Sequence, residues 1–592
     1  MIFAVSAVVL FGICGLAIDS GLSYLSANKV ERAAAAGALA GVTYMPSDFA
    51  TAQSAATAAV ERNGYPASSV TVFKVSGDNP PKLCDDVVVL CATNRLGVSV
   101  NTSVSNTFTK LLGFGPQHTV LQRAVAEFLS TLTLGQPGSH IGSQEDQINA
   151  SPQQGFYFLR TEGWGTPRSE GDAYTPSNTW DGTTDMHTIS GKLGTEATLP
   201  GGWMTLPDCG GYDFQITVPQ AELGKPVHVE VYNPSFGPDQ PSSNKYRESD
   251  GTFDKTKAAQ YDTMLYTLFQ ENDRFNRQTD TPLSQTLFDP INGTTTAPPP
   301  PTPSTWTDER TGATLTAATV NAFYHQWVDP TSSASLSGAQ LVNQNLPGGV
   351  VPHWTGSLAP SNTPYRLRVD TLDGAANGCS ASSVANGAGG GHKGYAVRVV
   401  DAAGVECAAC TIGGLNELAF YTPLVASGGG TTSFDIPMVN IPAVYAGQTI
   451  DLFAFDPGDV GNATNYIDVI DPCPTVVAGS CTAPAIASDP SNVKVYDLGT
   501  NKATTPSAGL QLDATHWPDQ TQARILTSQG GAHPYNGHWI LFKIPVPTTY
   551  APTTAANQYW SLRYELTGGT ATDTLTIAVG FDGPPVHLVP NP

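Results

Sequence analysis

The sequence predicts a mainly β protein with an N-terminal long α-helix, in which a small α+β module precedes two related β-sandwich (jelly-roll-like) domains. Three observations support this fold class. Residues 1–42 are mostly apolar or small and contain no proline. Many later segments alternate apolar and polar residues, which is the period of a β-strand. A strand motif that begins at Val218 recurs at Ile441.

The predicted N-terminal helix covers residues 1–42. Residues 1–18 carry no charge, and after Asp19 apolar residues recur at three- and four-residue steps, which places them on one helix face. A run of about 18 apolar residues is at the low end of the length that spans a bilayer. Small residues let helices approach closely, as at Gly37 and Gly41. We therefore expect the helix to lie in a membrane or to pack with copies of itself.

The residues expected to form this oligomerisation surface are Ile2, Phe3, Val5, Val8, Leu10, Phe11, Gly12, Gly15, Leu16, Gly21, Leu22, Leu25, Gly37 and Gly41. The simpler alternative is a single-pass anchor. A cleaved secretory signal is disfavoured, because no Lys or Arg precedes the apolar run and the helical pattern continues beyond any cleavage point.

A small module follows the helix. A second helix is predicted to end at Asn63-Gly64, since glycine commonly ends helices. β-branched residues predict strands over residues 70–75, 87–91 and 98–104. A short helix over residues 107–114 and a strand over 118–130 complete the module.

The segment GLAIDSGLSYLSANKVERAAAAGALAG resembles the start of TadG-like (TadE/TadG) pilus-assembly proteins, which typically read as an apolar run, G-x-A-x-D-x-G, an aromatic residue and A-x-x-x-A-L-A-G. The matching residues are Gly15, Ala17, Asp19, Gly21, Tyr24 and Ala36 to Gly41. A strand that ends Arg-Ala-x-Ala at Arg123 to Ala126 continues the resemblance, which covers about residues 1–130. It implies a pilin-like module. Type IV pilin-like subunits often carry Glu at the fifth mature position, which is Val5 in this chain if Met1 is the mature start.

The remaining chain is predicted to contain a linker at 131–154, one β-sandwich at 155–428 and a related one at 429–592. The motif at Val218 aligns without a gap to the motif at Ile441, and YRLRVD at Tyr365 resembles WSLRYE at Trp560. Chance similarity between two β-hairpins is the alternative. A Pro/Thr-rich run at 294–305 is expected to be an exposed excursion from the first sandwich.

Composition limits the possible partners. Lys+Arg number 28 and Asp+Glu 50, so the net charge is -22, and an acidic chain repels nucleic acid. Hydrophobic residues make up 40% of the chain, which argues against disorder. Frequent Gly and Pro are typical of turn-rich β domains outside the cell.

Cysteines predict an exported, disulfide-braced protein. Besides Cys14 in the helix, the chain has Cys84, Cys91, Cys209, Cys379, Cys407, Cys410, Cys473 and Cys481. Cys84 with Cys91 and Cys473 with Cys481 are local pairs. The others could pair as Cys407 with Cys410 and Cys209 with Cys379, or otherwise. The C-x-x-C at Cys407 is also half a zinc motif, but no second half or nearby histidine accompanies it.

No H-E-x-x-H, G-x-S-x-G or phosphate-binding loop is present in the sequence, so we expect no enzyme and no cofactor. A structural calcium ion is the one candidate metal, because Asp456 and Asp459 place hard oxygen ligands in a turn. The alternative is an ordinary aspartate-rich turn. Glycosylation sequons lie at Asn101, Asn149, Asn292 and Asn462.

These observations favour a structural subunit of an extracellular, pilus-like cell-surface filament that polymerises through its N-terminal helix. The expected partners are copies of itself and, before assembly, the membrane and a secretion or assembly machinery. The alternative is a membrane-anchored surface adhesin or glycan-binding protein, either of which could be a minor or tip pilin. An extracellular hydrolase has no motif to support it.

Overall fold

The computed structural model describes residues 2–45, 49–76, 81–84, 91–113, 115–129, 131–143, 157–162, 171–174, 197–200, 211–219, 222, 225, 227–232, 262–272, 277–288, 305–307, 314–316, 327–328, 358, 364–373, 392–401, 403–422, 424–426, 431–458, 464–477, 479–488, 493–500, 510–512, 522–528, 535–571 and 574–590. The chain forms two compact units. Unit 1 comprises Met1–Thr131 and Gly583–Pro592, and unit 2 comprises Leu132–Asp582.

Unit 1 combines helices with one antiparallel sheet. Its elements are α1 (Ile2–Val42), α2 (Phe49–Arg62), β1 (Val70–Ser76), β2 (Cys91–Ser105), β3 (Gln117–Phe128) and β32 (Val586–Val589), with the 3-10 helices η1 (Ala67–Ser69) and η2 (Thr109–Leu112). The long N-terminal helix is confirmed. α2 ends just before Gly64, whose φ of 92° is strained for any residue with a Cβ. The strand predicted at 87–91 falls almost entirely outside the described residues.

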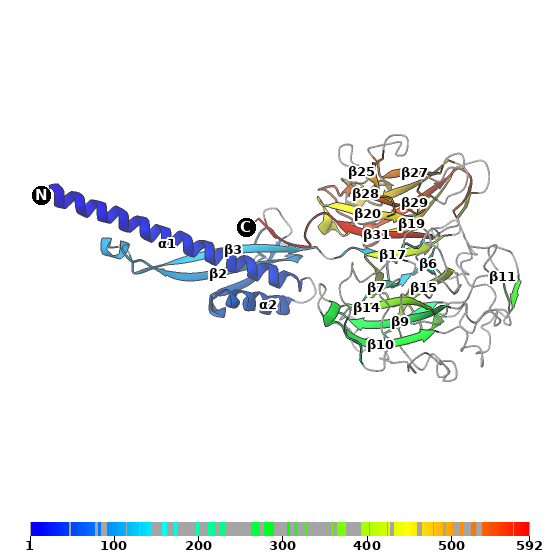
Figure 1. Ribbon diagram of the computed structural model, residues 1–592, viewed down its shortest axis with the longest axis horizontal. Coiled ribbons are helices and arrows are strands. Elements are labelled where there is room, and N and C mark those ends of the chain that lie inside the picture. Colours follow the sequence, from blue (N-terminus) through cyan, green and yellow to red (C-terminus); the bar gives the residue numbers. More distant parts are fainter. Residues whose placement is uncertain are drawn as a thin grey trace. The chain divides into compact units, whose positions relative to one another are not determined.

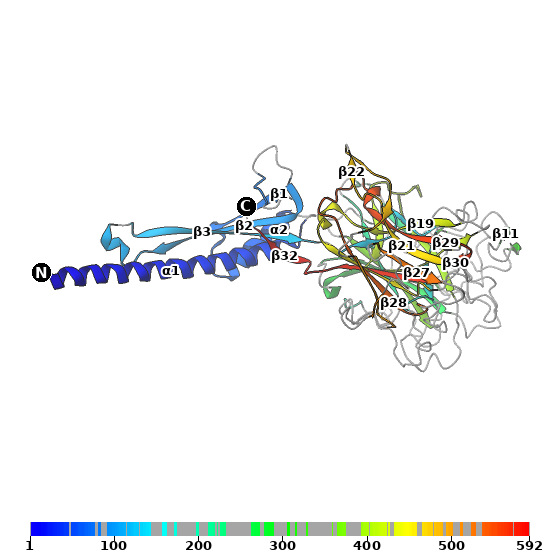
Figure 2. The ribbon, with the colours of Figure 1, turned by 90° about the horizontal axis from the view of Figure 1, so that it is seen from above.

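The sheet of unit 1 has the order β1-β2-β3-β32, and α1 and α2 pack on one of its faces (Figures 1 and 2). Small and β-branched residues fill the interface because they let helix and sheet backbones lie close together. The buried core includes Val30, Ala33, Ala34, Ala38, Ala52, Ala56, Val60, Leu96, Val98, Val100, Ala124 and Ala126. The second half of α1 is thus a core helix of unit 1.

Gly37 and Gly41 belong to this core. A Cβ at Gly41 would lie 2.5 Å from Cδ2 of Leu96 and 2.6 Å from the carbonyl oxygen of Ala52, and one at Gly37 would lie 2.7 Å from Cγ2 of Val60. The glycines therefore allow α1 to approach α2 and β2 of its own chain. This differs from the sequence-based expectation that the pair lies on a surface for other copies.

The end of the chain returns to unit 1. β32 pairs with β3, with Val586 opposite Phe128 and Val589 opposite Val125. His587 Nε2 lies 3.4 Å from Glu127 Oε2 on the same pair of strands. Residues 583–590 therefore complete the sheet of unit 1, whereas the sequence assigned them to the second sandwich. Unit 2 is inserted between β3 and β32.

Unit 2 is built mainly from two 11-stranded antiparallel sheets (Figure 1). In spatial order the first contains β10 (Thr281–Phe288), β9 (Asp262–Gln270), β14 (Tyr365–Asp373), β7 (Tyr212–Thr217), β16 (Thr411–Leu415), β4 (Thr133–Leu134), β19 (Thr432–Asn440), β29 (Tyr559–Leu566), β21 (Asn465–Asp471) and β24 (Ala485–Ile486), and β27 (Arg524–Ser528) also pairs with β21. The second contains β13 (Trp327–Val328), β8 (Val227–Tyr232), β15 (His392–Asp401), β6 (Phe158–Glu162), β17 (Glu417–Tyr421), β31 (Thr574–Phe581), β20 (Thr449–Phe455), β28 (Trp539–Pro545), β25 (Lys494–Asp497) and β26 (Leu510–Gln511), and β5 (His140–Ile141) also pairs with β15.

Smaller elements complete unit 2. They are the strand pairs β11 (Thr305–Thr307) with β12 (Thr314–Thr316), β18 (Leu424–Ala426) with β30 (Gly569–Ala571) and β22 (Val476–Val477) with β23 (Ser480–Cys481), and the 3-10 helices η6 (Arg277–Thr279), η8 (Ala443–Tyr445) and η9 (Ala556–Gln558).

The two large sheets contain the same topology twice. The order β10-β9-β14-β7 in one half matches β27-β21-β29-β19 in the other, and β13-β8-β15-β6 matches β28-β20-β31-β17. If the strands of each half are numbered one to eight along the chain, both halves give the orders 5-4-7-2 and 6-3-8-1. This is the jelly-roll topology. The fold class expected from the sequence, two related jelly-roll-like sandwiches after an α+β module, is confirmed.

Register supports the internal repeat. Arg368 on β14 lies opposite Asp213 on β7, and Arg563 on β29 lies opposite Asp435 on β19. The corresponding strands therefore place an arginine opposite an aspartate at the same register position, and both arginines lie in the matched segments YRLRVD and WSLRYE.

The two jelly rolls are joined edge to edge. β6 pairs with β17, and β16 and β4 lie between β7 and β19, so both sheets continue from one jelly roll into the other. Residues 132–582 accordingly form one unit, and the expected linker at 131–154 contributes the short strands β4 and β5 to it. Apart from Thr305, the Pro/Thr-rich run at 294–305 lies outside the described residues.

Candidate functional site

In the first half of α1, the large apolar side chains that the structure describes are exposed. The large apolar side chains range from 48% exposed at Ile18 to 88% at Phe3, with Leu10, Phe11, Ile13 and Leu16 between them. Successive helical residues are about 100° apart, so these positions lie around much of the helix circumference. A helix that is apolar all round needs an apolar environment on all sides. By length and composition α1 could cross a membrane within Leu10–Val42.

The predicted oligomerisation residues fall into three groups. Phe3, Leu10, Phe11, Leu16, Leu22 and Leu25 are exposed, and a Cβ at Gly12 or Gly21 would meet nothing within 4 Å. Gly15, Gly37 and Gly41 are covered by other parts of unit 1. Ile2, Val5 and Val8 lie on α1, but their side chains are outside the described residues.

Asp19 is the first charged residue of α1, and its side chain is buried. Its carboxylate accepts hydrogen bonds from the backbone N–H groups of Thr107 (3.0 Å), Phe108 (2.8 Å) and Thr109 (2.7 Å), and from the Thr109 hydroxyl (2.8 Å). These donors belong to the hairpin tip, which we define as residues 106–113 and 115–116 between β2 and β3. Asp19 therefore fixes the hairpin tip to α1.

These four hydrogen bonds favour the charged form of the carboxylate. The negative charge of Asp19 is therefore satisfied within unit 1.

A second contact lies one helical turn farther along α1. Ser23 Oγ is 2.9 Å from Nε2 of His118, and the other ring nitrogen of His118 is 2.7 Å from Oδ1 of Asn106. A Cβ at Gly15 would lie 2.7 Å from Cβ of Phe108, so the glycine gives the hairpin tip room to approach. α1 extends beyond this point toward its N-terminus (Figures 1 and 2).

The described cysteines form two of the predicted disulfides. Cys407 is bonded to Cys410 and Cys473 to Cys481, Cys84 is also in a disulfide, and Cys14 is free and exposed. Cys209 and Cys379 lie outside the described residues. Because Cys407 and Cys410 are bonded to each other, this C-x-x-C motif is explained by a disulfide and needs no zinc ion.

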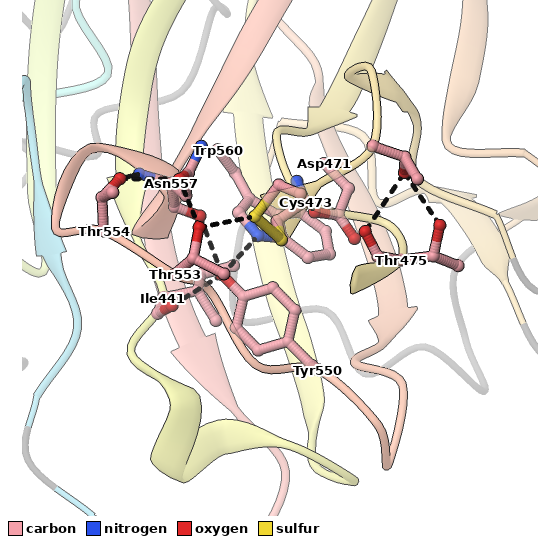
Figure 3. The surroundings of a disulfide bond; sticks show 11 residues. Ile441, Asp471, Cys473, Thr475, Tyr550, Thr553, Thr554, Asn557 and Trp560 are labelled. Carbon is pink, nitrogen blue, oxygen red and sulfur yellow. Dashed lines mark hydrogen bonds between the residues drawn. A yellow bond between two sulfur atoms is a disulfide. The ribbon is translucent and has the colours of Figure 1, made fainter. Parts of the chain in front are cut away.

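A polar cluster surrounds the Cys473–Cys481 bond in unit 2 (Figure 3). Tyr550 donates its hydroxyl to the carbonyl of Ile441 at 2.9 Å and accepts the indole N–H of Trp560 at 3.2 Å. Thr553 Oγ1 lies 3.4 Å from the sulfur of Cys481. The cluster ties the disulfide-closed hairpin to the second jelly roll.

Asp471 lies at the base of this hairpin. It is buried, and among the residues the structure describes its carboxylate has one polar contact, the N–H of Cys473 at 2.8 Å. Burial raises the pKa of Asp471, and the hydrogen bond from Cys473 lowers it. The effect of burial is larger, so the pKa is about 6.

Two other buried carboxylates lie where the jelly rolls meet. Tyr212 on β7 donates its phenol to Asp172, and Tyr174 donates its phenol to Glu417 on β17, both at 2.5 Å. Tyr174 and Tyr212 also stack edge to face. The two acids are only 1% and 7% exposed, so their geometry indicates a bridge between the jelly rolls rather than a site open to substrate.

The calcium expectation finds no support among the described residues, which contain no group of three or more His, Cys, Asp or Glu side chains able to hold a metal. The carboxylate of Asp456 accepts a hydrogen bond from the backbone N–H of Gly537. The backbone φ of Asp456 is 62°. Asp459 and the sequons at Asn149, Asn292 and Asn462 lie outside the described residues, while Asn101 is exposed on β2.

Comparison of the chain with protein-family models, with curated proteins and with solved structures found no match. The partner of Asp19 could not be predicted from the sequence, because the hairpin tip is 88 to 90 positions away along the chain.

Proposed function

We propose that this chain is a structural subunit of an extracellular, pilus-like filament, which polymerises through the first half of α1 and displays unit 2 on its surface. The observation that supports the proposal most strongly is the exposed apolar surface of α1 on many sides before Asp19. In a bundle of identical helices, copies would cover this surface from every direction.

Before assembly the same half of α1 would hold the subunit in a membrane, from which an assembly machinery would extract it. The second half of α1 already has its partners in α2 and the sheet. Unit 1 can therefore stay folded while the first half of α1 exchanges lipid for neighbouring helices. The disulfides and the dense antiparallel sheets of unit 2 suit an extracellular location.

A charge on the exposed half of α1 tests this proposal. Phe11→Glu and Leu16→Glu should abolish filaments while leaving unit 1 folded, because both side chains are exposed. Glu61→Lys, on the exposed side of α2, is the matched charge control and should assemble normally. Electron microscopy of sheared material, quantified by immunoblot, gives the readout. Filaments at normal yield from Phe11→Glu would contradict the proposal.

A second candidate is a membrane-anchored surface adhesin or glycan-binding protein. The observation that favours it is a difference between the jelly rolls. The pair formed by Arg366 and Asp213 is at most 3% exposed, whereas the Arg563–Asp435 pair on the corresponding sheet of the second jelly roll is 25% and 42% exposed. The charged groups of the second pair are therefore accessible from solvent and could contact a ligand. Binding of the full chain to a glycan array, lost on Asp435→Ala, would support this candidate.

A further inference from the structure

We propose that the hairpin tip is a second membrane contact: while the first half of α1 is in a bilayer, Phe108 and Lys110 lie in the lipid headgroup region. The inference rests on the membrane-held stage of the proposed function. It adds a surface outside α1, a partner for that surface, and a depth of insertion.

The first charge on α1 sets the depth. Ile2 to Ile18 contain no Asp, Glu, Lys or Arg. An ionisable side chain is costly within the hydrocarbon core of a bilayer. Asp19, the first charged residue of α1, therefore belongs at the boundary between hydrocarbon and headgroups.

Asp19 brings the hairpin tip to the same depth. Its carboxylate is bound by Thr107, Phe108 and Thr109, and Ser23 contacts His118 one turn later. These contacts also satisfy the carboxylate, so an acidic group at the edge of the hydrocarbon is not left without hydrogen bonds. As long as they hold, α1 cannot be inserted to Asp19 without placing the tip at the membrane surface.

The exposed side chains at this level suit a membrane interface. Phe108 is 39% exposed and Lys110 is exposed on the tip, and Tyr24 on α1 is 68% exposed. Aromatic rings are enriched at membrane–water interfaces, and a lysine keeps its ammonium in water while its stem covers apolar surface.

In the membrane-held stage, the exposure of α1 favours lipid, rather than a second copy of this chain, as the partner of its apolar surface. Leu10, Phe11, Ile13, Leu16 and Ile18 face different directions and each is about half exposed or more. One neighbouring helix covers one side, whereas lipid covers all sides. The hairpin tip lies at the end of that surface and is continuous with it.

The test uses the full chain and an environment-sensitive fluorophore on a single thiol. Native Cys14 is free and exposed and reports the position of α1. Lys110→Cys, made together with Cys14→Ser, reports the hairpin tip. Glu61→Cys in the same background is the control on α2. Vesicles of phosphatidylcholine and phosphatidylglycerol carry quenchers either at the headgroups or at the bilayer centre.

We expect vesicles to raise the fluorescence of the label at 110 several-fold, with stronger quenching from the headgroups than from the centre. The label at 61 should not respond. Asp19→Ala should reduce the response of the label at 110 to that of the control, because the tip is released. The label on Cys14 should still be quenched from the bilayer centre, because α1 stays inserted.

If vesicles do not change the fluorescence of the label at 110 while the label on Cys14 is quenched from the bilayer centre, the inference is overturned and the proposed function is left intact. A response to protein concentration instead of lipid would also overturn it, since the contact would then be a second copy. If Cys14 reports no lipid either, both the inference and the membrane-held stage fail, whereas filament formation is decided separately by microscopy.

Discussion

Thr109 donates both its backbone N–H and its hydroxyl to the carboxylate of Asp19, at 2.7 and 2.8 Å, across 90 positions of the chain. This contact divides α1 into two parts. From Val30 onward the helix packs into its own unit, and before Asp19 the large apolar side chains that the structure describes are exposed.

Removal of the Asp19 carboxylate should free the hairpin tip without unfolding unit 1. In Asp19→Ala the N–H groups of residues 107–109 lose their acceptor, so their hydrogen exchange should become roughly tenfold faster or more. Ser23→Ala, which removes one side-chain contact, should have a smaller effect. Unchanged exchange at 107–109 in Asp19→Ala would show that the carboxylate does not hold the tip.

A side chain at Gly41 should destabilise unit 1 rather than act on assembly alone. Gly41→Leu forces atoms into Leu96, Ala52 and Ala56, which should cost at least about 2 kcal/mol of unfolding free energy. Gly12→Leu, at a position with nothing within 4 Å, is the matched control and should unfold like the natural chain. Urea denaturation of unit 1 measures both. Equal stability of the two variants would contradict the packing described here.

Asp471 should make unit 2 less stable as the pH rises. Burial raises its pKa to about 6 from 3.8, so the folded state holds the proton more tightly than the unfolded chain. Its contribution is fully present below about pH 4 and is lost as the pH rises through about 6.

Asp471→Asn keeps an acceptor for the N–H of Cys473 and removes the charge. Relative to the natural chain it should be more stable by about 2–3 kcal/mol at pH 7.5 and equally stable at pH 4. Denaturant titrations at the two pH values measure this difference. The same offset at both values would mean that Asp471 does not titrate in this range.

The Cys473–Cys481 bond should stabilise unit 2. It closes a loop with a sequence separation of 8, so Cys473→Ser with Cys481→Ser should lower the unfolding free energy by about 2–3 kcal/mol. Cys14→Ser, which removes a free thiol, is the control and should change nothing. Peptide mapping under non-reducing conditions checks the pairing itself.

Local patterns in the sequence were sufficient to predict the long N-terminal helix and the repeated β-sandwich. The absence of proline before Pro46 predicts α1, and the matched motifs at Val218 and Ile441 predict two related sandwiches. These features depend on residues close together in the chain, where helical and strand periodicity specify which side chains share a face.

Long-range partners could not be predicted in the same way. Periodicity shows that Gly37 and Gly41 lie on one helix face, but not that α2 of the same chain covers that face. It also gives no sign that β32 returns to β3, or that β4 and β16 join the two jelly rolls. Each of these depends on pairing between segments far apart in sequence, which a single chain does not reveal through composition or spacing.

Cryo-electron microscopy of material sheared from cells that make this protein tests the central proposal most directly. We expect filaments composed mainly of this chain, with the first half of α1 in the filament core, unit 2 outside, and Asp19 still bound to Thr109. Recovery of the chain only with membranes, with no filament that contains it, would contradict a filament subunit and favour the anchored adhesin.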